Sequence, residues 1–132
     1  VSSLNVDKVV YVDSEHEITE VRNLVTKQSD GTAAKDKPVA VYGSKLKLGE
    51  TDSGIYFAPL DGKGEYDRDE NNWVAVAEEK IFRNLPGELN FFVPDSLTEG
   101  DSYCIVVKTN YLSKGRNRKD AVQMVSSPVQ IT

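Results

Sequence analysis

The chain has 132 residues, a formal net charge of −5 and one cysteine. This length predicts a single domain, residues 1–132, whose core is large enough to fold without disulfide bonds, and one cysteine excludes an internal disulfide. The negative charge gives no general attraction to nucleic acid or anionic membranes, and no apolar stretch is long enough for a transmembrane helix.

The first third of the chain predicts strands separated by polar segments. Val9–Val12 is a short run of β-forming residues, and residues 1–17 are expected to be a linker or an edge strand from a preceding domain. The apolar spacing in Ile18–Thr26 fits one stripe of a helix, but the β-branched content and the turn signal at Asp30-Gly31 favour a strand, bulged or regular. Residues 27–37 form a polar connection. Because the sequence starts without methionine, we expect a segment of a longer protein, with a mature product as the alternative.

The middle of the chain continues this pattern of strands and turns. Short strands are predicted at Pro38–Tyr42, Ser44–Leu48 and Gly54–Ala58, the second of them alternating Leu and Lys as a half-exposed sheet requires. Asp61–Asn72 is a long acidic loop, and Trp73–Glu78 returns to a strand pattern.

A tight reversal between two late strands gives the clearest architectural signal. After the apolar pair Ile81-Phe82 and a turn at Asn84–Gly87, the strand Leu89–Val93 leads to a turn that ends at Gly100, and Tyr103 opens the next strand. A tyrosine in this position is typical of the tyrosine corner of Greek-key sandwiches. Since alternate residues of paired strands point to one side, we predict a shared core that contains Leu89, Phe91, Tyr103, Ile105 and Val107.

The C-terminal region predicts one hairpin and one last strand. The strand Tyr103–Tyr111 is followed by a basic hairpin tip, Leu112–Asp120, and then by Ala121–Val125 and Val129–Ile131. Pro128 between the last two segments indicates an edge strand or a bulge. With eight or nine short strands and no sustained helix, the chain is predicted to be an all-β, Ig-like Greek-key β-sandwich.

Several motifs follow one another in a recognisable order: Gly43–Leu48, Gly54–Phe57, Asn84–Leu89, Phe92–Pro94, Leu97–Gly100 with Tyr103, and Val107–Tyr111. This order resembles an uncharacterised bacterial Ig-like domain family, whose members commonly sit C-terminal to a DNA-binding domain resembling the nucleoid protein HU. The resemblance covers Ile18 to Thr132. Two features depart from it: two residues separate Gly100 from Tyr103 where one is commoner, and residues 33–37 replace an expected Pro-Gly turn. Because the family has no established activity, the resemblance implies a fold and a modular context, and no catalytic residue.

Residues suited to catalysis or metal binding are few. His16 is the only histidine and lies in a polar segment, so we expect a solvated surface residue. Cys104 lies in an apolar strand and is predicted to be a core residue rather than a reactive thiol. No His/Cys spacing typical of a metal site occurs, and the acidic loop lacks the carboxylate order of an EF-hand, which favours a solvated loop over a weak Ca²⁺ site. We therefore predict no enzyme activity, no catalytic residue, no cofactor and no metal.

One basic cluster is the candidate contact for phosphate or another anion, and it consists of Lys114, Arg116, Arg118 and Lys119. The adjacent Asp120 and the acidic domain favour an ordinary solvated hairpin tip over a nucleic-acid surface. We expect three aromatic residues, Tyr56, Tyr66 and Trp73, in core or strand-face positions. The alternative is that they form a platform on which a sugar stacks.

The sequence predicts a non-catalytic accessory or interaction module, the C-terminal domain of a bacterial HU-like, nucleoid-associated DNA-binding protein. Its expected partner is another protein or the adjacent domain, with DNA contact weak or made through the neighbouring domain, and with no membrane contact. The expected location is the cytoplasm, at the nucleoid. The alternative is an extracytoplasmic Ig-like module for adhesion or carbohydrate binding.

Overall fold

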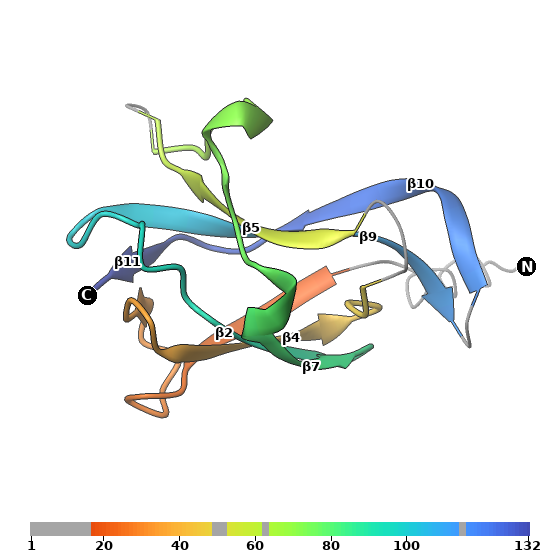
Figure 1. The fold of residues 1–132 in the computed structure, drawn as a ribbon, viewed down its shortest axis with the longest axis horizontal. Coiled ribbons are helices and arrows are strands. Elements are labelled where there is room, and N and C mark those ends of the chain that lie inside the picture. Colours follow the sequence, from red (N-terminus) through yellow and green to blue (C-terminus); the bar gives the residue numbers. More distant parts are fainter. Residues whose placement is uncertain (1–16, 49–52, 62–63, 114–115) are drawn as a thin grey trace, which may run out of the picture.

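The computed structural model of the protein describes residues 17–48, 53–61, 64–113 and 116–132. In this part of the chain two sheets pack face to face (Figure 1). The four-stranded sheet has the order β2-β4-β8-β7, and the six-stranded sheet has the order β3-β11-β9-β5-β6 with β10 also paired to β9. The strands are β2 (Glu17–Asn23), β3 (Thr32–Ala33), β4 (Pro38–Ser44), β5 (Gly54–Pro59), β6 (Val74–Ala75), β7 (Ile81–Leu85), β8 (Glu88–Phe92), β9 (Ser102–Ser113), β10 (Arg116–Val125) and β11 (Val129–Ile131).

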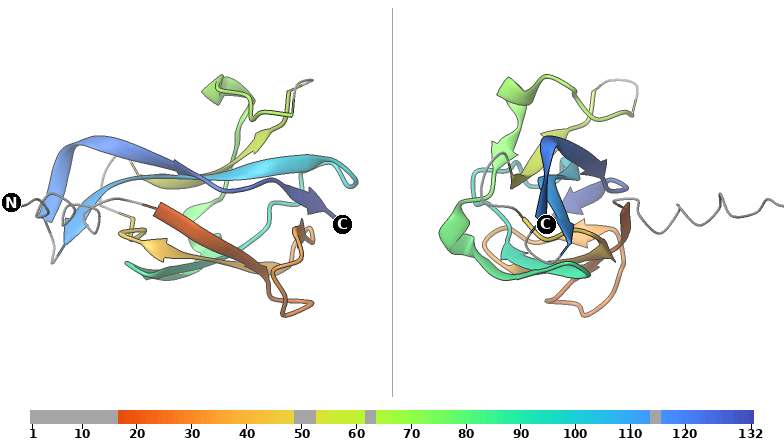
Figure 2. Two further views of the ribbon diagram at one scale, coloured as in Figure 1. Left: turned by 180° about the vertical axis from the view of Figure 1, so that it is seen from behind. Right: turned by 90° about the vertical axis from the view of Figure 1, so that its right-hand side faces the viewer.

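The predicted all-β Ig-like sandwich is confirmed. Two short 3₁₀ turns, η2 (Glu70–Asn72) and η3 (Glu78–Lys80), are the helical elements of the described residues, and neither is long enough to cross a membrane. Seen from behind and from one end, the two layers are distinct, and the long β9–β10 hairpin extends past the end of the smaller sheet (Figure 2).

The core lies between the two sheets and contains all five residues predicted for it. Leu89 and Phe91 face inward from β8, and Tyr103, Ile105 and Val107 face inward from β9, so alternate residues point to one side as expected. Across the core, the ring of Phe57 on β5 meets Phe91 edge-on at 6.1 Å and Tyr103 edge-on at 6.4 Å. This aromatic cluster joins the two sheets.

The tyrosine corner is formed. The Tyr103 side chain is 7% exposed, and its hydroxyl accepts a hydrogen bond from the backbone N–H of Thr98 at 3.0 Å. Gly100 has φ +95°, a conformation that glycine adopts without the clash that a Cβ would cause. The two residues between Gly100 and Tyr103 therefore do not prevent the hydroxyl from reaching the preceding turn.

The strand predicted near Ile18 is also present, and it carries a bulge. β2 pairs antiparallel with β4, and the register shifts between Ile18 and Glu20. Next to this bulge the two backbones approach closely, because a Cβ built on Gly43 would lie 1.9 Å from the carbonyl oxygen of Glu17. β2 ends at Asn23, three residues before the predicted end, where the Asn23 side chain accepts a hydrogen bond from the Val25 N–H at 2.9 Å and stabilises a turn.

Three predicted elements differ in the structure. Ser44–Leu48 is not a second strand: β4 ends at Ser44, and Leu46 turns inward into the core while its N–H donates to the Pro86 carbonyl at 2.8 Å. The burial of Leu46 in the core therefore determines the backbone path of this segment, and the alternation of Leu and Lys does not. The strand predicted at Trp73–Glu78 is shorter in the structure: Val74 and Ala75 pair with β5, and the 3₁₀ turn η3 follows. The apolar pair Ile81-Phe82 begins a complete strand, β7, at the edge of the smaller sheet.

The C-terminal segments lie along one edge of β9. β10 pairs with the second half of β9 and β11 with its first residues, and Ser126–Pro128 interrupts the two strands. Ser126 fills the interruption, because its hydroxyl accepts from the Ile105 N–H and its own N–H donates to the Ile105 carbonyl, both at 2.9 Å. Pro128 therefore marks a bulge-like break. β11, which follows Pro128, lies between β3 and β9, whereas β10, which precedes the break, is paired only with β9 among the described strands.

Candidate interaction surfaces

The basic cluster does not lie on a nine-residue loop. β9 continues to Ser113 and β10 starts at Arg116, so Arg116, Arg118 and Lys119 belong to a strand, while Lys114 lies outside the described residues. The β9–β10 ladder shifts register twice in this region, first after Arg116 and again after Asn117. A hairpin end with irregular strand pairing thus replaces the predicted nine-residue tip. The side chains of this segment are outside the described part, and their contact with phosphate stays a prediction.

The candidate nucleophile is buried. Cys104 is 5% exposed on β9, and burial raises the pKa of its thiol, which lowers the fraction of reactive thiolate. His16 lies outside the described residues. Within residues that the structure describes, no three His, Cys, Asp or Glu side chains gather in a way that could hold a metal ion.

Most described residues of the acidic segment are exposed, as expected of a solvated loop, and its carboxylates also form local hydrogen bonds. The Asp67 carboxylate accepts hydrogen bonds from the backbone N–H of Asp69 and from the side-chain amide of Asn72, each at 2.8 Å. These two bonds lower the pKa of Asp67. Asp69 in turn caps η2 by accepting from the Asn71 N–H at 3.0 Å. The carboxylates of Asp67 and Asp69 therefore stabilise local turns and do not converge on a common ligand position.

The aromatic residues predicted as an alternative sugar platform pack against protein groups. The rings of Tyr56 and Trp73 lie 5.6 Å apart and tilted by 50°, and the Trp73 indole N–H donates to the Asp67 carbonyl at 2.5 Å. The Arg68 guanidinium lies 5.2 Å from the centre of the Tyr66 ring. All three aromatic side chains are half-buried, and the contacts of Trp73 with Tyr56 and Asp67 connect the acidic segment to β5.

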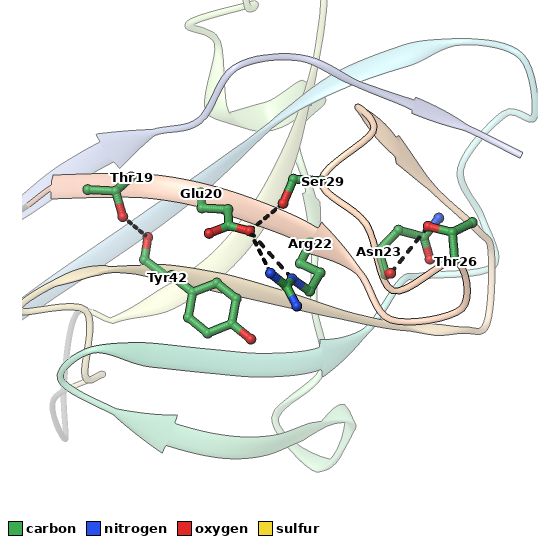
Figure 3. A network of polar contacts seen from close by, with 7 residues as sticks. All are labelled: Thr19, Glu20, Arg22, Asn23, Thr26, Ser29 and Tyr42. Atoms are coloured by element: carbon green, nitrogen blue, oxygen red, sulfur yellow. Dashed lines mark hydrogen bonds and ion pairs between the residues drawn. The ribbon is translucent and has the colours of Figure 1, made fainter.

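A polar network covers the solvent side of β2 (Figure 3). The Glu20 carboxylate accepts a short hydrogen bond from the Ser29 hydroxyl and is paired with Arg22 at 3.3 Å. The Ser29 bond, followed by the Arg22 contacts, lowers the pKa of Glu20 against the opposing effect of desolvation, so the carboxylate stays ionised at neutral pH. The Arg22 guanidinium also lies 5.9 Å from the centre of the Tyr42 ring on β4.

Beside this network, a groove of about 260 Å³ runs between β2 and the break that separates β10 from β11. One wall is the β2 stretch Ile18–Val21, and the other is Ser126–Val129. Ser29 and Gly31 also line the groove. The groove therefore combines a strand edge from one sheet with an interruption in the other.

A second surface lies on the outer side of the four-stranded sheet. Phe82 on β7 and Phe92 on β8 are 53% and 37% exposed, with ring centres 5.3 Å apart, and Leu85 nearby in the sequence is 44% exposed. Asn90 on β8 is 7% exposed, and its side-chain oxygen is buried without a hydrogen-bond partner. Asn90 faces the Ala40 position of β4 in the sheet register.

Sequence reasoning did not find the groove or this aromatic pair. The β-branched content of Ile18–Thr26 favours a strand, but it does not indicate which backbone edge has a neighbour. Phe82 was predicted as part of a short apolar pair, and only the pairing of β7 with β8 brings it next to Phe92.

Comparison with known proteins places this fold. Residues 17–124 match the family model described as a domain of unknown function (DUF4469) with an Ig-like fold. The structure is also similar to a crystal structure described as a "putative bacterial DNA binding protein" from Bacteroides vulgatus, with a TM-score of 0.73 and 21% sequence identity. That match covers 88% of this chain and 47% of the other, so this chain spans less than half the length of its structural relative. Among curated proteins, none matches.

Proposed function

The chain belongs to the DUF4469 family of domains with an Ig-like fold, and from this premise we propose that it is a non-catalytic interaction module of a bacterial DNA-binding protein. The observation that carries the proposal is the partial match to the Bacteroides protein, because 47% of that chain is covered and the rest is available for another domain. Most of the DNA affinity would then reside in the neighbouring domain. The location that follows is the cytoplasm, at the nucleoid.

The charge of the chain supports an accessory role. A net charge of −5 opposes the approach of DNA, and the densest group of cations in the sequence has four members. Four phosphate contacts would give a salt dependence with a slope of about −3 to −4 in log K against log salt. Affinity of this kind is lost quickly between low and physiological salt, so a partner protein or the adjacent domain is the better ligand for this module.

The non-catalytic part of the proposal is supported by the environment of Cys104. A buried thiol with a raised pKa is a poor nucleophile, and burial also keeps a substrate from its sulfur. The extracytoplasmic carbohydrate-binding alternative receives less support, because the rings of Tyr56 and Trp73 pack against each other at a tilt of 50°.

A titration of labelled duplex DNA with the 132-residue chain tests the proposal. We expect weak binding at low salt, no measurable binding at physiological salt, and further weakening when Lys114, Arg116, Arg118 and Lys119 are all replaced by Ala. The longer parent protein should bind the same duplex at physiological salt. Tight binding by the isolated chain at physiological salt that the quadruple variant retains would contradict an accessory role.

A further inference from the structure

β2 is a terminal strand whose outer backbone edge is partly open. Among the strands that the structure describes, its one neighbour in the four-stranded sheet is β4. The N–H of Asn23 points away from β4 and donates to the Gln28 carbonyl at 2.9 Å, which closes the end of this outer edge. Since backbone groups alternate in direction along a strand, the N–H and C=O of Val21, two residues earlier, point to the same outer edge. That edge faces the groove.

The side chains at the groove include apolar residues of the sandwich core that the two sheets do not cover completely. Ile18 and Val21 face inward and pack against the core, yet both are only half-buried, because the two sheets are open on this side. Ser126, Ser127 and Val129 line the other wall, and Ser29 also lies at the groove. An added strand would cover the apolar side chains with one face and leave its other face in solvent.

The charges along β2 select the kind of strand. Glu17 and Glu20 lie on the solvent-facing side of β2, where Glu20 is also paired with Arg22, and the whole chain is acidic. A residue directly opposite Glu20 on an added strand would lie within reach of its carboxylate, and opposite charges in such cross-strand pairs are favourable. A segment with small apolar side chains on one face and Lys or Arg on the other therefore matches the apolar inner side and the acidic outer side of β2.

We propose that this groove binds an extended, basic segment of a partner protein, which adds as a fifth strand to the four-stranded sheet beside β2. The proposal rests on the interaction role proposed above and names the chemistry of the partner. The bulge near Thr19 and the closed end at Asn23 limit the pairing to a few residues, so the complex is of the transient kind. A second copy of the chain fits less well, because two β2 edges would bring two bulges and two acidic strands together.

The test uses the 132-residue chain and the acetylated, amidated peptide Ser-Val-Lys-Val-Lys-Val-Ser, followed by amide chemical shifts and by amide hydrogen exchange. We expect saturable shifts at Ile18 and Val21, slower exchange of the Val21 N–H, and no shift at Phe82. Methylation of the peptide's backbone nitrogens on the pairing side should abolish the shifts, because it removes the hydrogen bonds of the added strand. Replacement of both peptide Lys residues by Glu should weaken binding.

Protein variants separate the charge pair from general electrostatics. Glu20→Gln should weaken binding of the Lys peptide about two- to fivefold, the range of one cross-strand charge pair, and Glu20→Lys should make the Glu peptide the better ligand. The control Glu79→Gln removes the same charge from the exposed turn η3 and should leave binding unchanged.

Several results would overturn the proposal. They are equal binding of the backbone-methylated peptide, shifts confined to the outer aromatic pair, or no shift at any site. Shifts at Val21 that depend on protein concentration without peptide would assign the edge to a second copy. Binding only after removal of residues 1–16 would assign it to the chain's own N-terminal residues. None of these results changes the DNA titration, so this proposal and the proposed function can fail separately.

Discussion

The tyrosine corner allows a quantitative test of the sandwich, through the substitution Tyr103→Phe. This change keeps the ring that packs against Phe57 and removes the oxygen that accepts the Thr98 N–H. A typical hydrogen bond contributes about 0.5–1.5 kcal/mol net, and an abandoned donor costs up to about 3 kcal/mol when it is buried. Because Thr98 is an exposed residue, water can reach its N–H, and we expect a loss of about 1 kcal/mol.

Urea denaturation measures this loss as a lower midpoint with an unchanged slope, since the surface exposed on unfolding stays the same. Tyr103→Ala should cost about 3–5 kcal/mol, because it also removes a buried ring, and the difference between the two variants isolates the ring. The control Tyr42→Phe changes a half-buried tyrosine on the outer face and should stay within about 0.5 kcal/mol of the unmodified protein. If Tyr103→Phe is as stable as the unmodified protein, the corner hydrogen bond does not stabilise the fold.

Three further predictions concern other parts of the sandwich. Gly43→Ala should destabilise the protein by about 3 kcal/mol in urea denaturation, because the new Cβ would clash with the Glu17 backbone, whereas the control Gly87→Ala, whose Cβ would meet nothing nearer than 3.8 Å, should be tolerated. Asn90→Leu should raise the free energy of unfolding by about 1 kcal/mol, because it removes a buried oxygen that has no partner; a loss of stability would show that this oxygen is satisfied in solution. The pKa of Asp67 is lower in the folded than in the unfolded protein, so the stabilisation by its carboxylate is complete above the usual aspartate pKa near 3.8 and is lost as the pH falls through the folded value. Asp67→Asn should therefore flatten the dependence of the unfolding free energy on pH in that range. An unchanged slope would contradict this.

The sandwich could be predicted because its strongest signals are local. A turn with a positive-φ glycine, followed by Tyr103 and an apolar run, specifies two paired strands and the inward face of one of them. The strand Gly54–Ala58 is also predicted, and the β-branched residues near Ile18 together with the turn signal at Asp30-Gly31 predict the strand that the structure shows with a bulge. In these segments the local preference and the tertiary environment agree.

Failures occurred where tertiary contacts override the local pattern. Leu46 and Leu48 alternate with lysines as a strand does, but Leu46 is drawn into the core and its N–H finds a carbonyl in a distant turn. Thr32–Ala33 was placed in a polar connection, yet it forms a parallel strand with β11 from the other end of the chain. In both cases the deciding partner is far away in the sequence, so no pattern within the segment identifies it.

The same reasoning explains why the groove beside β2 could not be predicted. A strand carries its side-chain pattern on its two faces, whereas an open edge is a property of its backbone, and backbone groups are the same in every residue except proline. β2 and β4 are both strands of one sheet, but within the described part of the chain β4 has neighbours on both sides and β2 has one. Only the complete sheet order distinguishes them. The walls of the groove come from residues 18–31 and 126–129, which the fold brings together from opposite ends of the described chain. If this module acts through an added strand, its binding depends mainly on the open backbone edge of β2. Substitutions that preserve the sheet order also preserve this edge. The side chains that add specificity are Glu20, through its charge, and the apolar residues that line the groove.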